Sequence, residues 1–221
     1  IFRRNRAQKH FNENRHSRNI ICKSRQLGFT TDEAIDMFDD VLFTRNHDTL
    51  FIAQDLDTAK DIFSNKVDYA WLNFLEPLKV QYKVNSESAR QFKFDFGDGS
   101  ISSITVDSSG RSGTFRRLHI TEFALVCAKF PERATEIIEG SIPAIPLDGR
   151  IDIESTAQGE TGHFADMFWE AWNRPRAPLQ TEFKAHFYNW TWDDEEIASI
   201  KEPIKDLPSE FKEYQRIYSL N

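Results

Sequence analysis

The stretch from Asn19 to Thr31 constrains the fold of this chain more than any other. An apolar run, Ile20 to Cys22, is followed by a polar turn that carries two cations and Gly28, and this turn leads into a helix-length segment over 32–44. Apolar residues recur in that segment at helical spacing, namely Ala34, Ile35, Phe38 and Leu42. A strand, a tight turn and a helix start in succession are typical of a phosphate-binding loop, in which backbone N–H groups and the helix dipole bind an anion.

The loop departs from the consensus G-x-x-x-x-G-K-[ST] at its principal cation. With the consensus aligned on 23–30, Gly28 takes the second glycine, Phe29 takes the lysine and Thr30 takes the hydroxyl that can hold Mg²⁺. Lys23 and Arg25 both have side chains long enough to curl back to a phosphate. The sequence leaves open which of them does so.

The composition indicates a folded protein with a substantial core. The chain has 221 residues, of which 39% are hydrophobic and 13% aromatic, which favours one packed unit over disorder. Cys22 and Cys127 fall in or beside apolar runs, so we expect buried free thiols in a reducing compartment. No apolar run reaches the length of a membrane span and no signal peptide is evident, so we expect a soluble, intracellular protein.

The net charge of −7 is unevenly distributed. Residues 1–25 contain eight Lys or Arg against Glu13 alone, a charge of +7, which leaves −14 for the rest. A protein that binds nucleic acid by charge alone is more basic than this, so any DNA contact should use a limited patch. Because the chain begins without Met and ends in no closing element, we also expect it to be part of a longer protein.

The order of the remaining elements predicts an α/β fold. Residues 3–11 suggest a polar helix, in which the Gln8 amide has the donor and the acceptor that an adenine edge requires. A strand at 48–54 and a helix at 56–74 follow, and strand–helix alternation implies parallel strands with crossovers. Three further strand-like runs, divided by turns at 85–88 and 97–99, should form an antiparallel edge or insertion: 78–84, 91–96 and 100–106.

The second half of the chain supplies two strands that end in polar residues. The strand at 116–122 ends in Glu122, and the strand at 150–157 runs into a turn that contains Gln158. Ligands of open α/β sheets bind beyond the carboxyl ends of the strands, so Glu122 is expected beside the phosphate loop, where it can orient or deprotonate a water. A helix at 131–145 broken near Pro143, an aromatic helix to 172, a strand at 182–190 and an acidic helical tail over 192–221 complete the prediction.

Three segments agree in order and spacing with one known family: Lys23–Thr31, Leu118–Ala124 and Glu154–Gly159. Together they resemble the ATPase domain of the large terminase subunit of tailed bacteriophages, over essentially the whole chain. The resemblance implies an ASCE-type P-loop ATPase, a three-layer α/β fold with a mostly parallel central sheet and antiparallel edge strands. It also implies one ATPase domain over 1–221, with an adenine-side basic segment at 1–18 and a C-terminal strand and tail from about 175 that leads to a nuclease domain beyond residue 221.

The resemblance also implies roles for individual residues. Glu122 resembles the acid that activates water, Thr30 and Thr121 resemble the metal-side residues, and Arg111 resembles an arginine that completes a neighbour's site, for which Arg116 and Arg117 compete. ATP would be bound by Gln8 and the loop residues Lys23, Ser24, Arg25, Gln26, Leu27, Gly28, Phe29, Thr30 and Thr31. Hydrolysis would be coupled to DNA movement by Ser155, Thr156, Gln158 and Gly159.

The implied cofactors are ATP and Mg²⁺. The implied partners are double-stranded DNA, a portal protein, a small terminase subunit and further copies in a ring on the procapsid, in the host cytoplasm. Two alternatives are open: a helicase-like nucleic-acid ATPase on a similar core, and a nucleotide-binding scaffold module that has lost hydrolysis, which is suggested by two departures from the family pattern, Phe29 and Thr121. Five acidic residues that could suggest a nuclease cluster are better explained for the most part as solvated surface: Asp98, Asp107, Asp152, Asp193 and Asp194.

Overall fold

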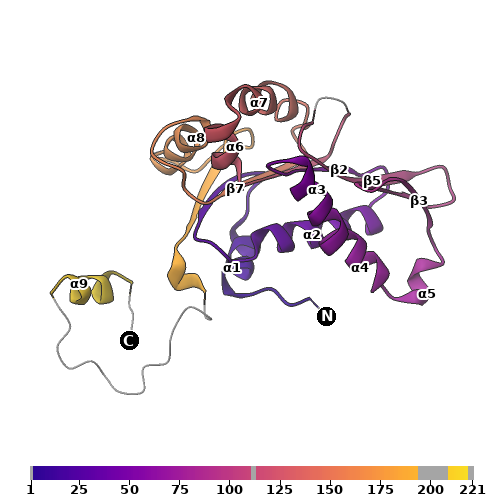
Figure 1. The fold of residues 1–221 in the computed structure, drawn as a ribbon, viewed down its shortest axis with the longest axis horizontal. Helices are drawn as coiled ribbons and strands as arrows, with labels where there is room; N and C mark the ends of the chain where they lie inside the picture. Colours follow the sequence, from indigo (N-terminus) through magenta and orange to yellow (C-terminus); the bar gives the residue numbers. More distant parts are fainter. Residues whose placement is uncertain (1, 111–112, 194–208, 219–221) are drawn as a thin grey trace, which may run out of the picture.

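A central sheet of eight strands lies between two layers of helices in the computed structural model, which describes residues 2–110, 113–193 and 209–218 (Figure 1). The sheet order is β3-β4-β5-β2-β6-β7-β1-β8. The strands are β1 (Arg18–Lys23), β2 (Asp48–Ile52), β3 (Lys83–Ser88), β4 (Gln91–Asp95), β5 (Ile101–Asp107), β6 (Arg117–Thr121), β7 (Arg150–Ser155) and β8 (Lys184–Tyr188). The strands from β5 to β8 in this order pair in parallel, whereas β4 pairs antiparallel with both β3 and β5.

The helices divide between the two faces of the sheet, as Figure 1 shows. One face carries α1 (Arg6–Asn14), α2 (Phe29–Phe43), α3 (Leu56–Ile62), the π-helical turn η1 (Phe63–Asp68), α4 (Tyr69–Leu72) and α5 (Glu76–Lys79). The other face carries α6 (Phe123–Lys129), α7 (Pro131–Glu136), the π-helical turn η2 (Ile137–Ser141) and α8 (His163–Trp172). A short 3₁₀ turn, η3 (Trp190–Trp192), follows β8, and α9 covers Ser209–Tyr218. The predicted three-layer fold with a mostly parallel sheet and antiparallel edge strands is confirmed.

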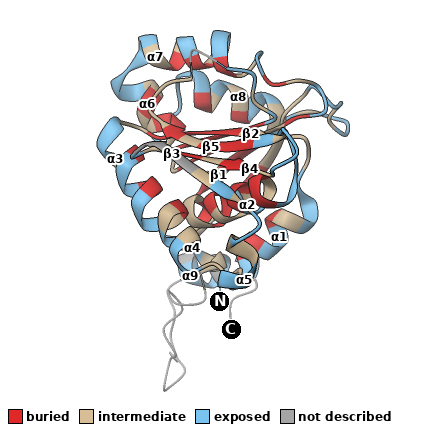
Figure 2. Cartoon of the chain, turned by 90° about the vertical axis from the view of Figure 1, so that its right-hand side faces the viewer, coloured by how far each residue is buried: buried red, intermediate tan, exposed pale blue. Residues whose placement is uncertain are grey.

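A separate apolar core fills the space on each side of the sheet. Successive strand residues point to opposite faces, so Ile20 packs with the α6 to α8 layer while Ile21 packs with α1. Phe51 and Ile104 pack with α2 and α3, on the same face of the sheet as α1. Figure 2 shows this buried interior between exposed helix surfaces. Because the six parallel strands run in one direction, their carboxyl ends meet at one edge, where polar loops follow β1, β6 and β7.

The predicted strand at 78–84 and the predicted turn at 85–88 are wrong. Residues 76–79 form α5, which has Pro77 in its first turn, a position where the fixed φ of proline suits a helix. Strand β3 then runs through 85–88 and pairs with β4 around a turn at 89–90. Pairing with a neighbouring strand overrides the local turn preference of this polar segment.

The other predicted elements are present with shifted ends, and one helix was missed. The predicted helix at 56–74 is divided among α3, η1 and α4, and the helix at 131–145 ends with η2 before Pro143. Helix α6 directly follows Glu122 and was not predicted. The tail is helical at Ser209–Tyr218, and its residues 194–208 lie outside the described part.

Cys22 and Cys127 are both unpaired, as predicted, but they are only partly buried. Within the described ranges, every helix is too short or too polar to span a lipid bilayer.

His186 on β8 is a buried titratable group in the aromatic core beneath α1. Its side chain is 6% exposed, and its Nε2 lies 3.0 Å from Asn19 Oδ1, which accepts a hydrogen bond from the neutral ring. Its ring contacts Phe11 edge-on at 5.1 Å. Burial is the main cause that lowers the pKa of His186 to about 3, with smaller contributions from the neighbouring Lys184, His10 and His16.

This histidine should make folding sensitive to mild acid. Its folded-state pKa lies below the value of about 6.5 in unfolded chains, so the unfolded chain takes up this proton first as the pH falls. The stability that neutral His186 provides is complete above pH 6.5 and is lost toward pH 3, at up to about 1.4 kcal/mol per pH unit. The free energy of unfolding, measured with urea, should fall less steeply between pH 6.5 and pH 5.0 in His186→Gln than in the wild type. His163→Gln, at an exposed position on α8, is the control, and equal slopes in wild type and His186→Gln would contradict the prediction.

Candidate nucleotide-binding site

The phosphate-type loop connects the end of β1 at Lys23 to the start of α2 at Phe29, as the sequence predicted. Two of its residues have left-handed backbone conformations, Gln26 with φ 62° and Gly28 with φ 71°. A Cβ atom at Gly28 would lie 2.7 Å from Gln8 Nε2. Glycine suits this position, because another residue would be strained at this φ and its side chain would displace the Gln8 amide.

The start of α1 supports the loop through hydrogen bonds. Gln8 Nε2 donates to the Gly28 carbonyl at 2.9 Å, and Asn5 Nδ2 donates to the Leu27 carbonyl at 3.0 Å. Gln8 Oε1 accepts from the Asn5 backbone N–H at 2.8 Å, and Gln8 is 4% exposed. Both ends of its amide are thus engaged within the protein. The adenine contact predicted for Gln8 stays a prediction, and it would require these bonds to open.

Phe29, at the consensus lysine position, faces the core. It is 1% exposed and packs against Phe11 at 5.6 Å and Tyr188 at 5.1 Å between ring centroids. Leu27 belongs to the same buried cluster. A lysine could not occupy this position without burying an unpaired charge. The apparent loss of the consensus cation therefore reflects a loop whose helix start is anchored by an aromatic cluster.

Phe29→Ala should act through stability. Removing a buried aromatic ring leaves a cavity, and we expect the free energy of unfolding to fall by about 3 kcal/mol. Denaturant unfolding measures this, with Phe29→Leu as the milder control. Because the ring points away from the loop surface, the affinity of the folded variant for ATP-γ-S should stay within about threefold of wild type; a larger loss would mean that Phe29 shapes the ligand surface.

The two candidate cations lie in different environments. Lys23 is 8% exposed, and its Nζ lies 3.2 Å from Glu122 Oε1 and 3.1 Å from Glu154 Oε2. Burial acts to lower the pKa of Lys23, but the two carboxylates outweigh it and raise that pKa above its usual value. Arg25 is exposed at the tip of the loop and forms no ion pair with the described residues. Lys23 is therefore the cation already held beside the acid.

Two threonine hydroxyls converge on one buried carboxylate. Thr30 Oγ1 donates to Glu154 Oε1 at 2.9 Å and lies 3.3 Å from Thr121 Oγ1, while Thr121 Oγ1 donates to the same carboxylate oxygen. The other loop polar groups have different partners. Thr31 Oγ1 accepts from Lys66 Nζ at 2.9 Å, and the Ser24 backbone N–H donates to the Tyr188 carbonyl at 2.7 Å.

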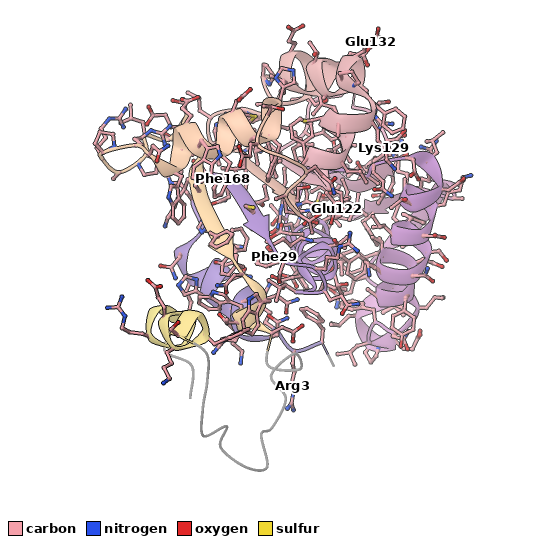
Figure 3. All side chains as sticks on the ribbon, turned by 60° about the vertical axis from the view of Figure 1, so that its left-hand side comes forward. Arg3, Phe29, Glu122, Lys129, Glu132 and Phe168 are labelled. Carbon is pink, nitrogen blue, oxygen red and sulfur yellow. The ribbon has the colours of Figure 1, made fainter. Side chains whose placement is uncertain are left out.

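Glu122 bridges the loop and the segment after β7. It caps the N-terminus of α6 with φ 51°, and its side chain is 28% exposed, so water can reach it. Its Oε2 accepts from Thr156 N at 3.3 Å, Thr156 Oγ1 at 3.2 Å and Ser155 Oγ at 3.4 Å. Gln158 and Gly159 lie in the exposed loop that follows. Figure 3 shows Glu122 between the layer that contains α6 and the layer that contains α2.

From the sequence, Glu154 was recognised only as the first residue of the segment Glu154–Gly159, and its contacts were not predicted. It is fully buried, and His119 Nε2 lies 3.8 Å from its Oε1. Burial acts to raise the pKa of Glu154, but Lys23 first, then His119 and the Thr121 hydroxyl, outweigh it and hold that pKa at about 2. Two acids that alternate with isoleucines in one strand were the available signal, since buried carboxylates persist only when paired.

A buried charge network extends from this site toward the opposite edge of the sheet. Arg117 is 1% exposed and its Nη2 lies 2.7 Å from Glu33 Oε2 and 2.9 Å from Asp36 Oδ2. The hypothesis that Arg117 completes a neighbour's site is therefore wrong, because its guanidinium is buried and already forms ion pairs within this chain. Asp152 is also fully buried, with Arg150 Nε 2.6 Å from its Oδ2, so it is an exception to the solvated surface predicted for most of the five acids.

The remaining arginine candidates are less constrained. Arg111 lies outside the described residues. Arg116 is at the amino end of β6 and pairs with Asp148 at 2.7 Å, with its side chain 45% exposed. Either assignment stays a prediction.

Comparisons with solved structures agree with this architecture. The ATPase domain of the Thermus phage P74-26 large terminase superposes with a TM-score of 0.63 at 16% identity, covering 98% of this chain and 89% of that one. The HK97 large terminase gives 0.62 at 14% identity, covering 84% and 39%, and the large terminase of a further, thermophilic bacteriophage gives 0.55 at 14%, covering 92% and 44%. No family model matches the sequence, and no curated protein is significantly similar to it. The chain therefore has the fold of the ATPase domain of phage large terminases.

Proposed function

We propose that this chain is the ATPase motor domain of a viral terminase large subunit, which hydrolyses ATP to move double-stranded DNA into a procapsid. The observation that carries the proposal is the connected set of a buried lysine, a helix-start hydroxyl and an acid at the carboxyl edge of the sheet: Lys23, Thr30 and Glu122. These are the group types that phosphoryl transfer to water requires.

ATP would bind with its phosphates over the loop 24–28 and the first turn of α2, where N–H groups and the helix dipole favour an anion. Lys23 is the proposed phosphate cation, because its ammonium already lies beside Glu122, and Arg25 at the loop tip is free to close over the nucleotide. The large terminase of the thermophilic bacteriophage has also been solved in complex with ATP-γ-S, and that structure superposes on this chain at 14% identity.

Mg²⁺ fits the donor set of this site. Among the described residues, no group of three or more His, Cys, Asp or Glu side chains is placed to hold a metal alone. Mg²⁺ in nucleotide sites is instead bound by one or two protein oxygens, with phosphates and waters completing its shell. Thr30 would supply the hydroxyl, with Thr121 close behind it, and the ion would neutralise charge on the phosphates.

Glu122 is the proposed catalytic acid–base residue. Its partly exposed carboxylate would accept a proton from the attacking water, an effect that contributes about 10²- to 10⁴-fold in enzymes. Lys23 would hold the phosphate beside it, so that the loose transition state is stabilised mainly by position and charge. A trans-acting arginine, Arg111 or Arg116, would add about 10³- to 10⁵-fold where copies form a ring.

Coupling to movement would use the hydrogen bonds that Glu122 accepts from Ser155 and Thr156. Loss of the γ-phosphate changes the charge beside Glu122, which alters these bonds and hence the exposed segment with Gln158 and Gly159. The proposed partners are double-stranded DNA, a portal protein, a small terminase subunit and further copies in a ring, in the host cytoplasm. A nuclease domain in the longer protein is part of the same proposal.

The test is phosphate release by the protein assembled on portal-containing procapsids with linear double-stranded DNA and Mg²⁺·ATP. The motor predicts ATP-dependent phosphate release together with DNA that becomes protected from added DNase. Tight nucleotide binding without phosphate release would favour the scaffold alternative. Strand separation of duplex DNA without DNase protection would favour the helicase alternative.

A further inference from the structure

The residue directly opposite Thr121 in the β6–β7 ladder is Glu154. Thr121 stands where the acidic strand of a nucleotide hydrolase carries its metal-side carboxylate, so the strand lacks a charge at this position. Neighbouring strands lie about 4.8 Å apart, and glutamate is one methylene longer than aspartate. The longer side chain of Glu154 crosses enough of this gap for its Oε1 to accept from Thr121 Oγ1, so the carboxylate lies beside the place that an aspartate on β6 would occupy.

The contacts of Glu154 are those required of such a carboxylate. Its Oε1 accepts from Thr30 Oγ1 at 2.9 Å and from Thr121 Oγ1, and its Oε2 lies 3.1 Å from Lys23 Nζ. Because the Thr30 hydrogen points to Glu154, the lone pairs of the Thr30 oxygen are left for a cation. Glu154 is fully buried, so its negative charge is little screened by solvent.

We propose that Glu154 is the metal-side carboxylate of this site, supplied by β7 in place of the acid missing from β6. The inference rests on the proposed function, because it concerns the Mg²⁺ that accompanies the nucleotide. Glu154 acts here as a positioning residue: it fixes the Thr30 hydroxyl, provides negative charge behind the cation and holds Lys23. Thr121 serves as the hydrogen-bonding spacer between the two strands.

The test is calorimetric titration of the wild-type protein with ATP-γ-S, in Mg²⁺ and in EDTA. The wild type should bind more tightly with Mg²⁺. The Mg²⁺-dependent gain is the ratio of the ATP-γ-S affinity in Mg²⁺ to the affinity in EDTA. In Glu154→Gln, which keeps the shape of the side chain but removes its charge, this ratio should fall about 10- to 100-fold, as expected for groups that support a metal ligand. Asp152→Asn removes another fully buried carboxylate from β7, and it should keep the gain whatever its effect on stability.

The exchange variant Thr121→Asp/Glu154→Gln makes the test independent of folding defects, because it returns a carboxylate to β6 and keeps the total charge. Its affinity ratio should return to within about threefold of the wild-type ratio, which is clearly less than the loss of about 10-fold or more expected for Glu154→Gln alone. A folded Glu154→Gln with an undiminished gain would overturn the inference, and so would a folded exchange variant with none. If the wild type bound no ATP-γ-S in either condition, the proposed function itself would fail.

Discussion

Glu122→Gln is expected to lower single-turnover ATP hydrolysis by about 10³-fold, within the range that general-base catalysis contributes. The amide cannot take the proton from water, but it keeps the size of the side chain and can still accept from Thr156. Lys23 retains Glu154 as a partner at 3.1 Å, so the loop should stay in place. Removing a negative charge beside the phosphates should leave ATP-γ-S affinity equal or higher.

Rapid-quench phosphate release and calorimetry separate these two effects. Glu132→Gln is the matched control, because Glu132 lies on the exposed surface of α7 away from the loop (Figure 3). It should match the wild type in both measurements. A Glu122→Gln variant that melts like the wild type but hydrolyses ATP at the wild-type rate would show that another group activates the water.

The sequence predicted those parts of the fold in which local pattern and tertiary structure agree. The run from Asn19 to Thr31 has a buried strand, a glycine that adopts positive φ and a helix with an apolar face, so each local signal indicates the same structure. Glu122 could be placed near the loop because parallel strands align their carboxyl ends. The edge strand β3 was mispredicted because its polar residues are held by pairing with β4, which leaves no trace in periodicity.

The site residues that were missed or misassigned depend on which neighbours they meet across the sheet. Glu154 and Asp152 alternate with isoleucines in β7, and only the pairing of β7 with β1 reveals that Lys23 compensates Glu154 and that Asn19 donates to Asp152. The same holds for Phe29, whose aromatic partners lie on α1 and β8. Spacing along one chain does not encode such contacts.

The basic N-terminal segment also has a different use from the one its charge suggests. Arg4 pairs with Asp32 and Asp36, and Arg15 pairs with Asp36, so these cations balance the acidic face of α2. Arg18 and Lys23 are buried. Arg4, Arg15 and Lys23 are thus paired within the protein and Arg18 is buried, which leaves less of the segment's charge available for DNA than the sequence implies.

Arg117→Met is expected to lower the free energy of unfolding by about 3 to 5 kcal/mol, because it leaves buried carboxylates without their partner. Burial acts to lower the pKa of Arg117, but Glu33, Asp152, Asp36 and Asp40 outweigh it and raise that pKa. Methionine fills much of the volume but neutralises none of these acids. Among the described residues, Arg150 is then the only arginine left to pair with both Glu33 and Asp152. Urea unfolding at neutral pH measures the loss.

The neighbouring residue provides the control for this prediction. Arg116 is partly exposed and pairs with Asp148, so Arg116→Met should change stability by less than about 1 kcal/mol. Adding Glu33→Gln to Arg117→Met removes one of the stranded charges and should recover part of the loss, since the penalty comes from uncompensated burial and not from the absent pair itself. If Arg117→Met were as stable as Arg116→Met, the carboxylates on α2 and β7 would have to be satisfied by Arg150, Arg4 and Arg15 alone, and Arg117 would be dispensable to the fold.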